Sequence, residues 1–276
     1  MGRGGSTPPF GTRLEHRAVA LIGRAAVSKT ACWGFESLLP CHPFFDTLSF
    51  PGIPEETLAG LASANPLDMG LLRDVVAEFA DPPDGPLARL EEYGSYLLAG
   101  NTVARLMGPR DWDGLFPHLL DCAAAASFVP QDARTILDWG SGGGLPGLVW
   151  AILFPEKRIL LAERNGKKAG FLEEAAVRLE LTNVEVLHGQ AEEELKHEER
   201  PDIMVARAVE PLPKLLKRIR RNRVHFGSLF VMAGPNWEED WEEMPETSKS
   251  SWVLPARHKY SLGERGERFL AIFKPR

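Results

Sequence analysis

Apolar residues in the first half of the chain recur at helical spacing. The i, i+1, i+4, i+5, i+8 pattern of five of them predicts one helix face: Leu71, Leu72, Val75, Val76 and Phe79. A Pro- and Gly-rich break at 81–86 ends this helix, and the period resumes from Leu87 to Leu97. The apolar stretch 115–126 predicts a further helix. No strand pattern interrupts this region, so we expect residues 55–130 to form a helical cap.

From Ala133 onward, short β-like apolar runs alternate with helical patterns. Strands are predicted at 135–139, 158–162, 184–187, 203–206 and 229–232. Helices are predicted between them, at 145–154, 167–179 and 211–221. Two last runs, 252–254 and 269–273, indicate an antiparallel pair. This alternation is typical of a mostly parallel sheet with helices on both faces, so we expect residues 131–276 to form one α/β domain.

Composition narrows the class of protein. Hydrophobic residues make up 44% and charged residues 25% of the 276 residues, as in an ordinary globular protein. The longest apolar run, 145–154, is about half of the roughly 20 residues that a membrane helix needs, so no membrane partner is expected. The net charge of -6 excludes a wholly basic nucleic-acid coat protein, but a local basic patch stays possible.

The chain has three cysteines, Cys32, Cys41 and Cys122. They form no CxxC pair and no disulfide framework, which fits a reducing cytoplasm and predicts no metal site. Cys122 lies in a predicted helix and is expected to be a small core residue rather than a nucleophile.

The first 54 residues differ from the rest. Residues 1–9 are mostly Gly, Ser and Pro, and residues 13–29 are rich in Arg and poor in acids. Three interpretations stay open: a misassigned start that includes translated non-coding sequence, an organellar targeting peptide, or a genuine extension. The stretch 23–45 resembles the translation of an upstream transfer-RNA gene and favours the first interpretation. The true start would then lie at Met69 or slightly before it, and residues 1–54 are expected to be disordered.

A glycine-rich loop follows the first predicted strand and reads DWGSGGGLPG over residues 138–147. Glycines let the backbone turn sharply and let a ligand approach without a Cβ in the way. The start of the following helix adds unpaired N–H groups. Because ligands of open α/β sheets bind at the carboxyl ends of the strands, this loop predicts a binding site.

Two classes of ligand fit this loop. Gly142, Gly144 and Gly147 match the dinucleotide fingerprint, and Glu163 follows at the distance expected for a ribose contact. The loop also matches the Asp-x-Gly-x-Gly-x-Gly pattern of class I S-adenosylmethionine-dependent methyltransferases, beginning at Asp138. A carboxylate there suits a ligand that carries an ammonium and a sulfonium group, and it would repel a pyrophosphate. S-adenosylmethionine is therefore the favoured cofactor.

Residues 136–193 resemble the ribosomal RNA small subunit methyltransferase G family, also called glucose-inhibited division protein B. The matching features are the GLPG end of the loop and the Asn165-x-Lys167-Lys168 turn within this segment, and the Arg207-Ala208 pair after the fourth predicted strand. Outside this segment, the HLLD sequence at 118–121 resembles the family's HLLDS helix, and ERFL at 267–270 resembles its last strand. The similarity spans roughly residues 71–274.

The resemblance implies a class I, Rossmann-like methyltransferase fold with a small N-terminal helical subdomain. The family's ligand contacts fall on Gly140, on Leu145, on the pair Ala191-Glu192 beside the adenine, and on Arg207. Arg207 is expected to contact both cofactor and RNA, and it is the candidate catalytic residue. The expected cofactor-binding residues are Asp138, Gly140, Gly142, Leu145, Glu163, Ala191, Glu192 and Arg207.

The chain departs from the family pattern at several positions. The family's usual Trp-Asn is Gly100-Asn101 here, and its Asn-Leu-Thr is Arg105-Leu106-Met107. An arginine that is common in the family is Gln190 here, and its usual Lys-Gly is Ala233-Gly234. These departures spare the expected cofactor pocket but remove expected RNA contacts, which puts substrate affinity and the exact target base in doubt.

The resemblance implies transfer of a methyl group to guanine N7 at position 527 of 16S ribosomal RNA. The residues agree, because the Asn/Asp-Pro-Pro-aromatic motif of amino-directed enzymes is replaced by ARAVEP at 206–211. Guanine N7 has a free lone pair and needs in-line placement rather than deprotonation.

Basic residues gather on the predicted helix 211–221, whose buried side is expected to be Leu215, Leu216 and Ile219. A solvated face and a phosphate-binding face both stay open, and the density of one charge sign favours phosphate. The expected RNA-binding residues are Arg110, Lys167, Lys168, Lys217 and Arg218. The acidic runs 192–194 and 238–243 are expected to lie away from RNA, apart from Glu192.

These features together predict a cytoplasmic, monomeric enzyme whose partner is 16S ribosomal RNA or the small ribosomal subunit. Two alternatives remain. A nucleotide-cofactor oxidoreductase would bind a nicotinamide cofactor, and a non-catalytic RNA- or nucleotide-binding module would bind its ligand and transfer nothing.

Overall fold

The computed structural model describes residues 50, 52–53, 56–57, 60, 69–234, 236–262 and 266–276. All of them belong to one compact unit that begins at Phe45. The interpretations offered for residues 1–54 therefore fall almost wholly outside the described residues.

The region before the sheet is helical, as the apolar spacing predicts. Its longer described helices are α3 (Gly70–Val76), α4 (Asp84–Val103) and α5 (Trp112–Ala126). Helix α5 begins where the Asp111 carboxylate accepts a hydrogen bond from the Gly114 N–H, at 2.9 Å, and so caps the first turn. Cys122 is fully buried in α5, which confirms its core position.

The remainder of the chain forms a seven-stranded sheet in the order β3-β2-β1-β4-β5-β7-β6. The parallel strands are β1 (Thr135–Trp139), β2 (Arg158–Glu163), β3 (Val184–His188), β4 (Ile203–Arg207) and β5 (Ser228–Ala233). Two antiparallel strands, β6 (Trp252–Ser261) and β7 (Glu267–Pro275), complete the sheet. The predicted α/β class and the antiparallel end pair are confirmed, and the end pair is longer than its apolar runs indicated.

Helices connect the parallel strands. They are α6 (Gly147–Leu153), α7 (Gly166–Arg178), α8 (Ala191–Glu194) and α9 (Leu212–Arg221), and α10 (Trp237–Glu242) and α11 (Glu246–Lys249) follow β5. Helix α6 starts two residues later than predicted, because Leu145 and Pro146 still belong to the glycine loop. Strand β1 pairs with β2 on one side and β4 on the other. The chain runs outward from β1 through β2 to β3 and then crosses to β4, so the topological switch point lies between the carboxyl ends of β1 and β4.

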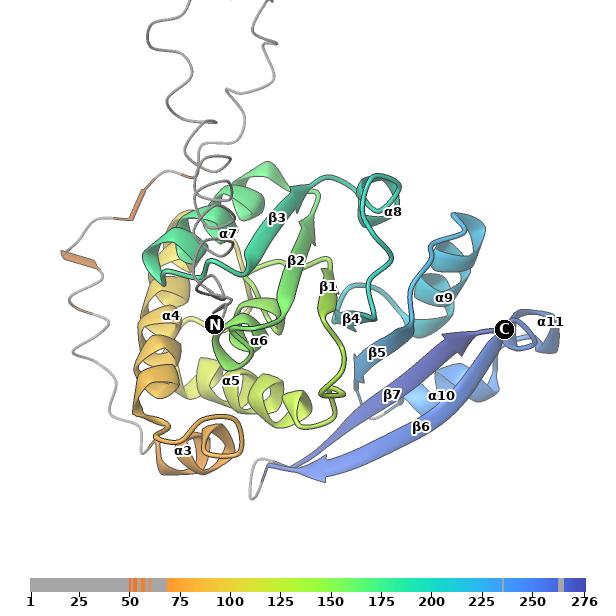
Figure 1. Cartoon of the computed structure of the whole chain (residues 1–276), viewed down its shortest axis with the longest axis horizontal. Helices are drawn as coiled ribbons and strands as arrows, with labels where there is room; N and C mark the ends of the chain where they lie inside the picture. Colours follow the sequence, from red (N-terminus) through yellow and green to blue (C-terminus); the bar gives the residue numbers. More distant parts are fainter. Residues whose placement is uncertain are drawn as a thin grey trace, which may run out of the picture. The chain divides into compact units, whose positions relative to one another are not determined.

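The sheet is buried on both faces. Ile136, Ile159 and Ile203 pack in one apolar cluster with α3, α4, α5, α6 and α7. Their neighbours Leu137 and Met204 point the other way and pack with α9 and α10. Figure 1 shows α3, α4 and α5 beside α6 and α7, while α9 and α10 lie toward the β5 end of the sheet. The helical region and the sheet thus share one core.

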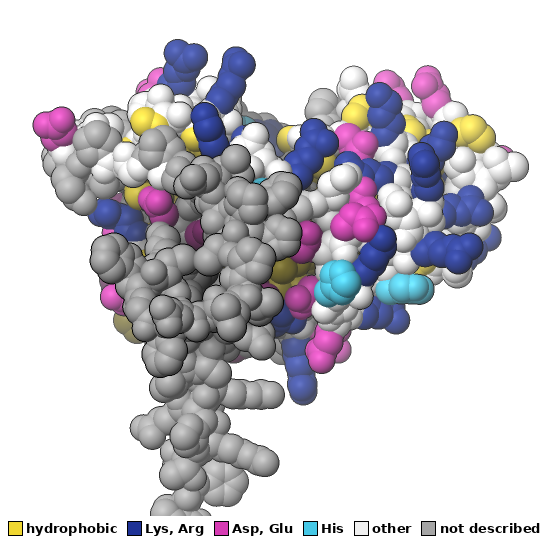
Figure 2. Space-filling model, turned by 90° about the horizontal axis from the view of Figure 1, so that it is seen from above, with side chains coloured by type: hydrophobic (Ala, Val, Ile, Leu, Met, Phe, Trp, Pro, Cys, Tyr) yellow, Lys and Arg dark blue, Asp and Glu magenta, His cyan; other side chains and the backbone are white. Residues whose placement is uncertain are grey.

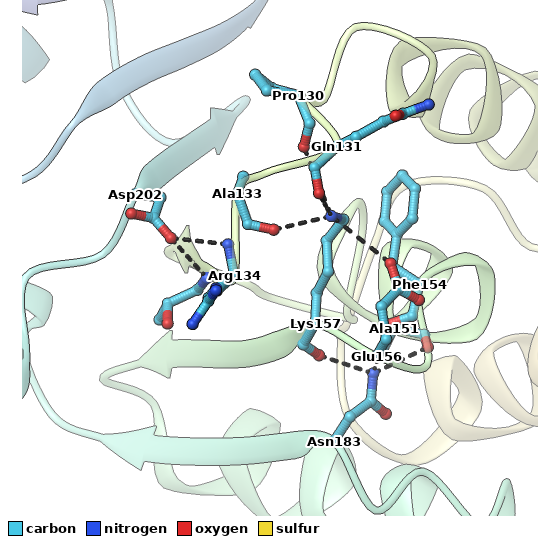
Figure 3. Close-up of polar contacts among 11 residues, drawn as sticks. Pro130, Gln131, Ala133, Arg134, Ala151, Phe154, Glu156, Lys157, Asn183 and Asp202 are labelled. Carbon is cyan, nitrogen blue, oxygen red and sulfur yellow. Dashed lines mark hydrogen bonds and ion pairs between the residues drawn. The ribbon is translucent and has the colours of Figure 1, made fainter.

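A network of polar contacts ties together the loops that precede the strands (Figure 3). Lys157 is 4% exposed, and its ammonium donates to the carbonyls of Ala133 at 2.8 Å and Gln131 at 3.0 Å. The Asn183 amide donates to three more carbonyls, those of Ala151, Phe154 and Lys157. The Asp202 carboxylate accepts from the N–H groups of Arg134 and Thr135. The network lies at the amino ends of β1, β2 and β4, opposite the glycine loop.

Candidate functional site

A cavity of about 760 Å³ lies at the carboxyl ends of β1, β2 and β4. Its walls are the glycine loop, the segment 106–109, residues 163–164, the turn 189–191 and residues 207–210. Six of the eight expected cofactor-binding residues line it: Gly140, Gly142, Leu145, Glu163, Ala191 and Arg207. Asp138 and Glu192 do not.

The glycine loop requires glycine where the prediction placed it. Gly140 has φ +76°, and a Cβ there would lie 3.1 Å from both methyl groups of Val209. Gly144 has φ +100°, in the left-handed region that side chains rarely adopt. Behind the loop, Tyr93 of α4 is fully buried and its hydroxyl donates to the Gly143 carbonyl at 2.9 Å. Tyr93 thus packs in the core, and its hydroxyl also fixes the loop.

Asp138 has a different position from the one its motif suggests. Its side chain is 1% exposed, and Oδ2 accepts a hydrogen bond from the Gly147 N–H at 2.9 Å. Burial raises the pKa of Asp138 to about 7, although the bond from Gly147 works against the shift. The carboxylate therefore ties the end of β1 to the first turn of α6. The expectation that it faces a cationic ligand is corrected, because the carboxylate turns inward from the loop.

Glu163 lines the cavity at the end of β2. Its Oε2 accepts from the Gly142 N–H at 2.9 Å, and its Oε1 accepts from the Asn165 N–H at 2.8 Å. Two backbone donors thus fix the carboxylate beside the glycine loop. The predicted ribose contact agrees with this position and stays a prediction.

Asn101 shapes the opposite wall. Its side-chain oxygen accepts from the N–H groups of Leu106 and Met107, at 2.9 and 3.0 Å, and its amide donates to Pro109 at 2.7 Å. At the preceding Gly100, a Cβ would meet the Phe171 ring at 2.6 Å. The packing of Phe171 therefore leaves no room for the tryptophan that is usual in the family at this position.

Glu192 and Arg218 form an ion pair in which Glu192 is buried and Arg218 is half-buried. Arg218 donates through Nε to Glu192 Oε1 at 2.8 Å and through Nη2 to Oε2 at 3.0 Å, and its guanidinium lies over the Trp139 ring. These hydrogen bonds to Glu192 raise the pKa of Arg218 against the effect of its burial. Glu192 does not line the cavity, whereas Arg218 does and pairs with Glu192. The expected contacts of the pair Ala191-Glu192 with the adenine and of Arg218 with RNA stay predictions.

The other expected RNA-binding residues are placed differently. Arg110, Lys167 and Lys217 are exposed, and Lys168 is half-buried and lines the cavity. The buried side of α9 is confirmed, since Leu215, Leu216 and Ile219 are each at most 1% exposed. Figure 2 shows that acidic side chains lie between the Lys and Arg side chains on the face seen from above.

Arg207 lies at the end of β4, with 17% of its side chain exposed. Its Nε is 3.5 Å from Asp121 Oδ2, and its Nη2 is 2.5 Å from His118 Nδ1. Burial works against the charged form, but the neighbouring Cys122 and Asp121 leave the pKa of Arg207 raised. Arg207 is thus a buried cation whose charge is neutralised by a buried acid.

Asp121 is a functional candidate that the sequence reasoning missed. It is 6% exposed, and its Oδ1 accepts a hydrogen bond from the Tyr260 hydroxyl at 2.7 Å. Arg268 approaches the same oxygen at 4.0 Å. The signal was present in the sequence, because Asp121 belongs to the HLLD segment and Arg268 to the ERFL segment.

A second cavity, of about 540 Å³, adjoins the first. The two cavities share the residues His118, Arg207, Ala208, Val209 and Glu210. The second extends along the end of β5 to Trp237 and Asp240 of α10 and to the start of β7. Arg207 therefore stands where a ligand in one cavity would meet a ligand in the other. Asp240 belongs to the acidic run 238–243, so part of that run faces the site.

The described part of the chain has neither a metal-binding cluster nor a helix that could span a membrane. No group of three or more His, Cys, Asp or Glu side chains there could hold a metal ion. None of the helices described is long and apolar enough to cross a membrane.

Comparison with known proteins identifies the family. The family model GidB, rRNA small subunit methyltransferase G, matches residues 87–265, more than half of the chain. Proteins named ribosomal RNA small subunit methyltransferase G are similar. The one from Thermobifida fusca is 42% identical over 53% of this chain and 62% of its own length. The one from Rubrobacter xylanophilus is 44% identical over 47% of this chain and 51% of its own length. The one from Halorhodospira halophila is 35% identical over 63% of this chain and 81% of its own length.

The matches thus span less than two thirds of the first two relatives, and more of the third. The matched residues include the glycine loop, Glu163, Ala191 and Arg207, which line the first cavity. The chain belongs to the ribosomal RNA small subunit methyltransferase G family.

Proposed function

We propose that the chain transfers a methyl group from S-adenosylmethionine to N7 of a guanine in 16S ribosomal RNA, the guanine at position 527. The family and the names of its members support the reaction class. The observation that carries the proposal is the pair of adjoining cavities at the carboxyl edge of the sheet. One is walled by the glycine loop, and Arg207 stands at their junction.

The first cavity suits S-adenosylmethionine better than a dinucleotide. The Gly142 N–H already donates to Glu163, so a donor that a pyrophosphate would need is occupied, and the carboxylate would repel it. Glu163 would hold the ribose hydroxyls of S-adenosylmethionine, and Ala191 and its backbone would flank the adenine. Gly140 and Leu145 would contact the rest of the S-adenosylmethionine molecule. Glu163, and not Asp138, supplies the carboxylate of the cavity wall that disfavours a pyrophosphate.

The transfer itself needs placement rather than acid–base chemistry. When bound, S-adenosylmethionine would supply an electrophilic methyl group, and guanine N7 would supply the lone pair that displaces it from sulfur. The residues of this chain orient the two reactants and exclude water. Arg207 would contact the RNA at the junction, with its planar guanidinium fixed by Asp121 and His118.

The exposed cations Arg110, Lys167 and Lys217 would bind RNA phosphates, and Lys168 would do so at the cavity mouth. The departures from the family pattern at Gln190 and Ala233 predict weaker RNA contacts there. We place the enzyme in the cytoplasm with its ribosomal substrate and propose that it acts as a monomer.

Mass mapping of methylated guanines tests the proposal. Small-subunit RNA from cells that lack the gene would be incubated with S-adenosylmethionine and the purified full chain. We expect one new 7-methylguanine, at position 527. A chain that binds S-adenosylmethionine in calorimetry but methylates no guanine would be a non-catalytic binding module. A chain that binds only a nicotinamide cofactor would be the alternative oxidoreductase.

A further inference from the structure

Two residues that line the second cavity each carry a buried polar atom without a hydrogen-bond partner. Among the described residues, the only buried side-chain nitrogen or oxygen atoms that lack a hydrogen bond are Glu210 Oε1 and Trp237 Nε1. Both residues line this cavity. Leaving a buried polar atom unpaired costs about 1–3 kcal/mol, so a concentration of such atoms at one place indicates a ligand that would pair them.

The chemistry of the two atoms is complementary to one kind of ligand. A carboxylate oxygen only accepts hydrogen bonds, and an indole N–H only donates. The nearest cation to Glu210 Oε1 is Arg218 Nη1 at 3.6 Å, beyond hydrogen-bond distance, and Arg218 is already bound by Glu192. The cavity wall therefore carries an acceptor and a donor that make no hydrogen bond to a described residue, and the acceptor is ion-paired with Arg218.

Two other acids of this cavity already have partners. Asp121 is bound by Tyr260 and Arg207, and Glu267 lies 2.7 Å from Lys259. Several carboxylates in one cavity disfavour a phosphate group, whereas a neutral base with N–H donors fits. Enzymes that act on a base in RNA read the extruded base through its Watson–Crick edge.

We infer that the second cavity holds the target guanine, that Glu210 accepts hydrogen bonds from its N1–H and N2–H groups, and that Trp237 donates to its O6. This inference rests on the proposed guanine-N7 transfer and adds the residues that select the base. Adenine presents an acceptor at N1 and a donor at C6, the reverse pattern, so Glu210 and Trp237 would both be mismatched. Arg207, at the junction of the two cavities, then lies between the Watson–Crick edge of the guanine and S-adenosylmethionine.

Inosine provides the test, because it keeps N1–H, O6 and N7 but lacks the N2 amino group. Single-turnover methylation would be measured for the full chain and Glu210→Gln, on small-subunit RNA carrying either guanosine or inosine at the target position. For the unaltered chain we expect inosine to lower kcat/KM about tenfold or more. For Glu210→Gln the guanosine-to-inosine ratio should fall to about threefold or less, because the group that reads N2–H has lost its charge.

Matched variants control for indirect effects. Glu238→Gln changes an exposed acid that pairs with Arg257, outside both cavities, and should keep the full ratio. Trp237→Phe should lower kcat/KM on guanosine about threefold or more, whereas Trp241→Phe in the same helix, which packs on Phe273, should not. Melting temperatures would show that each variant folds.

The outcomes separate the two proposals. Methylation of guanosine with the same guanosine-to-inosine ratio in Glu210→Gln and the unaltered chain would overturn the inference and leave the proposed function standing. No methylation of guanosine by the unaltered chain would overturn both.

Discussion

Arg207 keeps its positive charge in a largely buried position because three side chains surround it. Asp121 lies 3.5 Å from its Nε, His118 contacts its Nη2, and Tyr260 fixes Asp121 from the other side. The charge of Arg207 and burial lower the pKa of His118, so the imidazole is favoured in its neutral form next to the guanidinium. A neutral His118 can accept a hydrogen bond from Arg207, which fixes the orientation of the arginine.

Substitution of Arg207 should therefore affect both stability and catalysis. A simple surface salt bridge would predict an unchanged melting temperature, but Asp121 is buried and would lose its nearest cation. We expect Arg207→Ala to lower the free energy of unfolding by about 1–3 kcal/mol and methyl transfer by more than tenfold. Arg207→Lys should restore stability better than activity, because an ammonium lacks the planar fork. Urea unfolding and single-turnover methylation measure the two effects, and wild-type turnover by Arg207→Ala would remove it from the site.

The pKa of Asp138 gives a pH-dependent prediction. Because it is raised to about 7 in the folded chain and is near 3.8 when exposed, the folded state holds an extra proton between these values. Stability should therefore fall as pH rises from about 4 to about 7. Asp138→Asn should remove this component, so its unfolding free energy should exceed that of the unaltered chain at pH 8 more than at pH 5.

Asp202 is the matched control for this measurement. Hydrogen bonds from the N–H groups of Arg134 and Thr135 lower the pKa of Asp202, so its stabilising effect is present above the unfolded pKa and is lost as pH falls. Asp202→Asn should therefore destabilise the chain at pH 8. Equal pH profiles for Asp138→Asn and the unaltered chain would contradict the assignment of a buried, protonated Asp138.

At the scale of elements, α9 presents different charged residues to different surroundings. Leu215, Leu216 and Ile219 bury one side against the sheet, and Lys217 is exposed on the other. Arg218 lies between these sides and reaches α8 to pair with Glu192. The neighbours Lys217 and Arg218 therefore have separate roles, although the sequence presents them as one basic run.

Substitutions at these two positions should separate the roles. Lys217→Ala should weaken RNA binding and reduce the slope of log affinity against log salt by about one, without changing the melting temperature. Arg218→Ala should instead lower the melting temperature and the affinity for S-adenosylmethionine, because Glu192 would stay buried without its cation. Filter binding between 50 and 200 mM salt and calorimetry distinguish them. Identical effects of the two variants would argue for one continuous phosphate-binding face.

At the scale of the whole molecule, the unit that carries the site begins before the first predicted helix. Phe50 is 4% exposed, and its ring meets that of Phe171 at 5.4 Å in an edge-on arrangement. Phe171 also stacks on Tyr96, so Phe50 contacts the interface of α4 and α7. A start at Met69 would remove this contact.

Truncation tests how much of the N-terminal region the fold needs. A chain that begins at Phe50 should unfold at nearly the same temperature as the full chain. A chain that begins at Met69 should be less stable by about 3–5 kcal/mol, the usual cost of losing a buried phenylalanine. Calorimetric melting measures both, and equal stability would support Met69 as a sufficient start for the fold.

The sequence alone determined the fold class and the place of the site. The periods of apolar residues depend on neighbours a few positions away, so the strands β1 to β5 and the helices α7 and α9 were predicted nearly to the residue. The glycine loop was also predicted, because its positive φ angles at Gly140 and Gly144 require glycine locally. The family resemblance followed from the same contiguous segment and is confirmed.

Only the tertiary structure decided which partner each charged side chain binds. Asp138 and Glu192 read as ligand contacts, but the packed chain turns them toward Gly147 and Arg218. The contacts around Asp121 and Arg207 join residues that are far apart in the sequence. His118 and Arg207 are 89 positions apart, and Asp121 and Tyr260 are 139 positions apart. A buried carboxylate must find a donor wherever the fold brings one, because leaving it unpaired is costly. That choice depends on the order of the strands, which places the ends of β4, β6 and β7 beside α5, and a local pattern does not contain it.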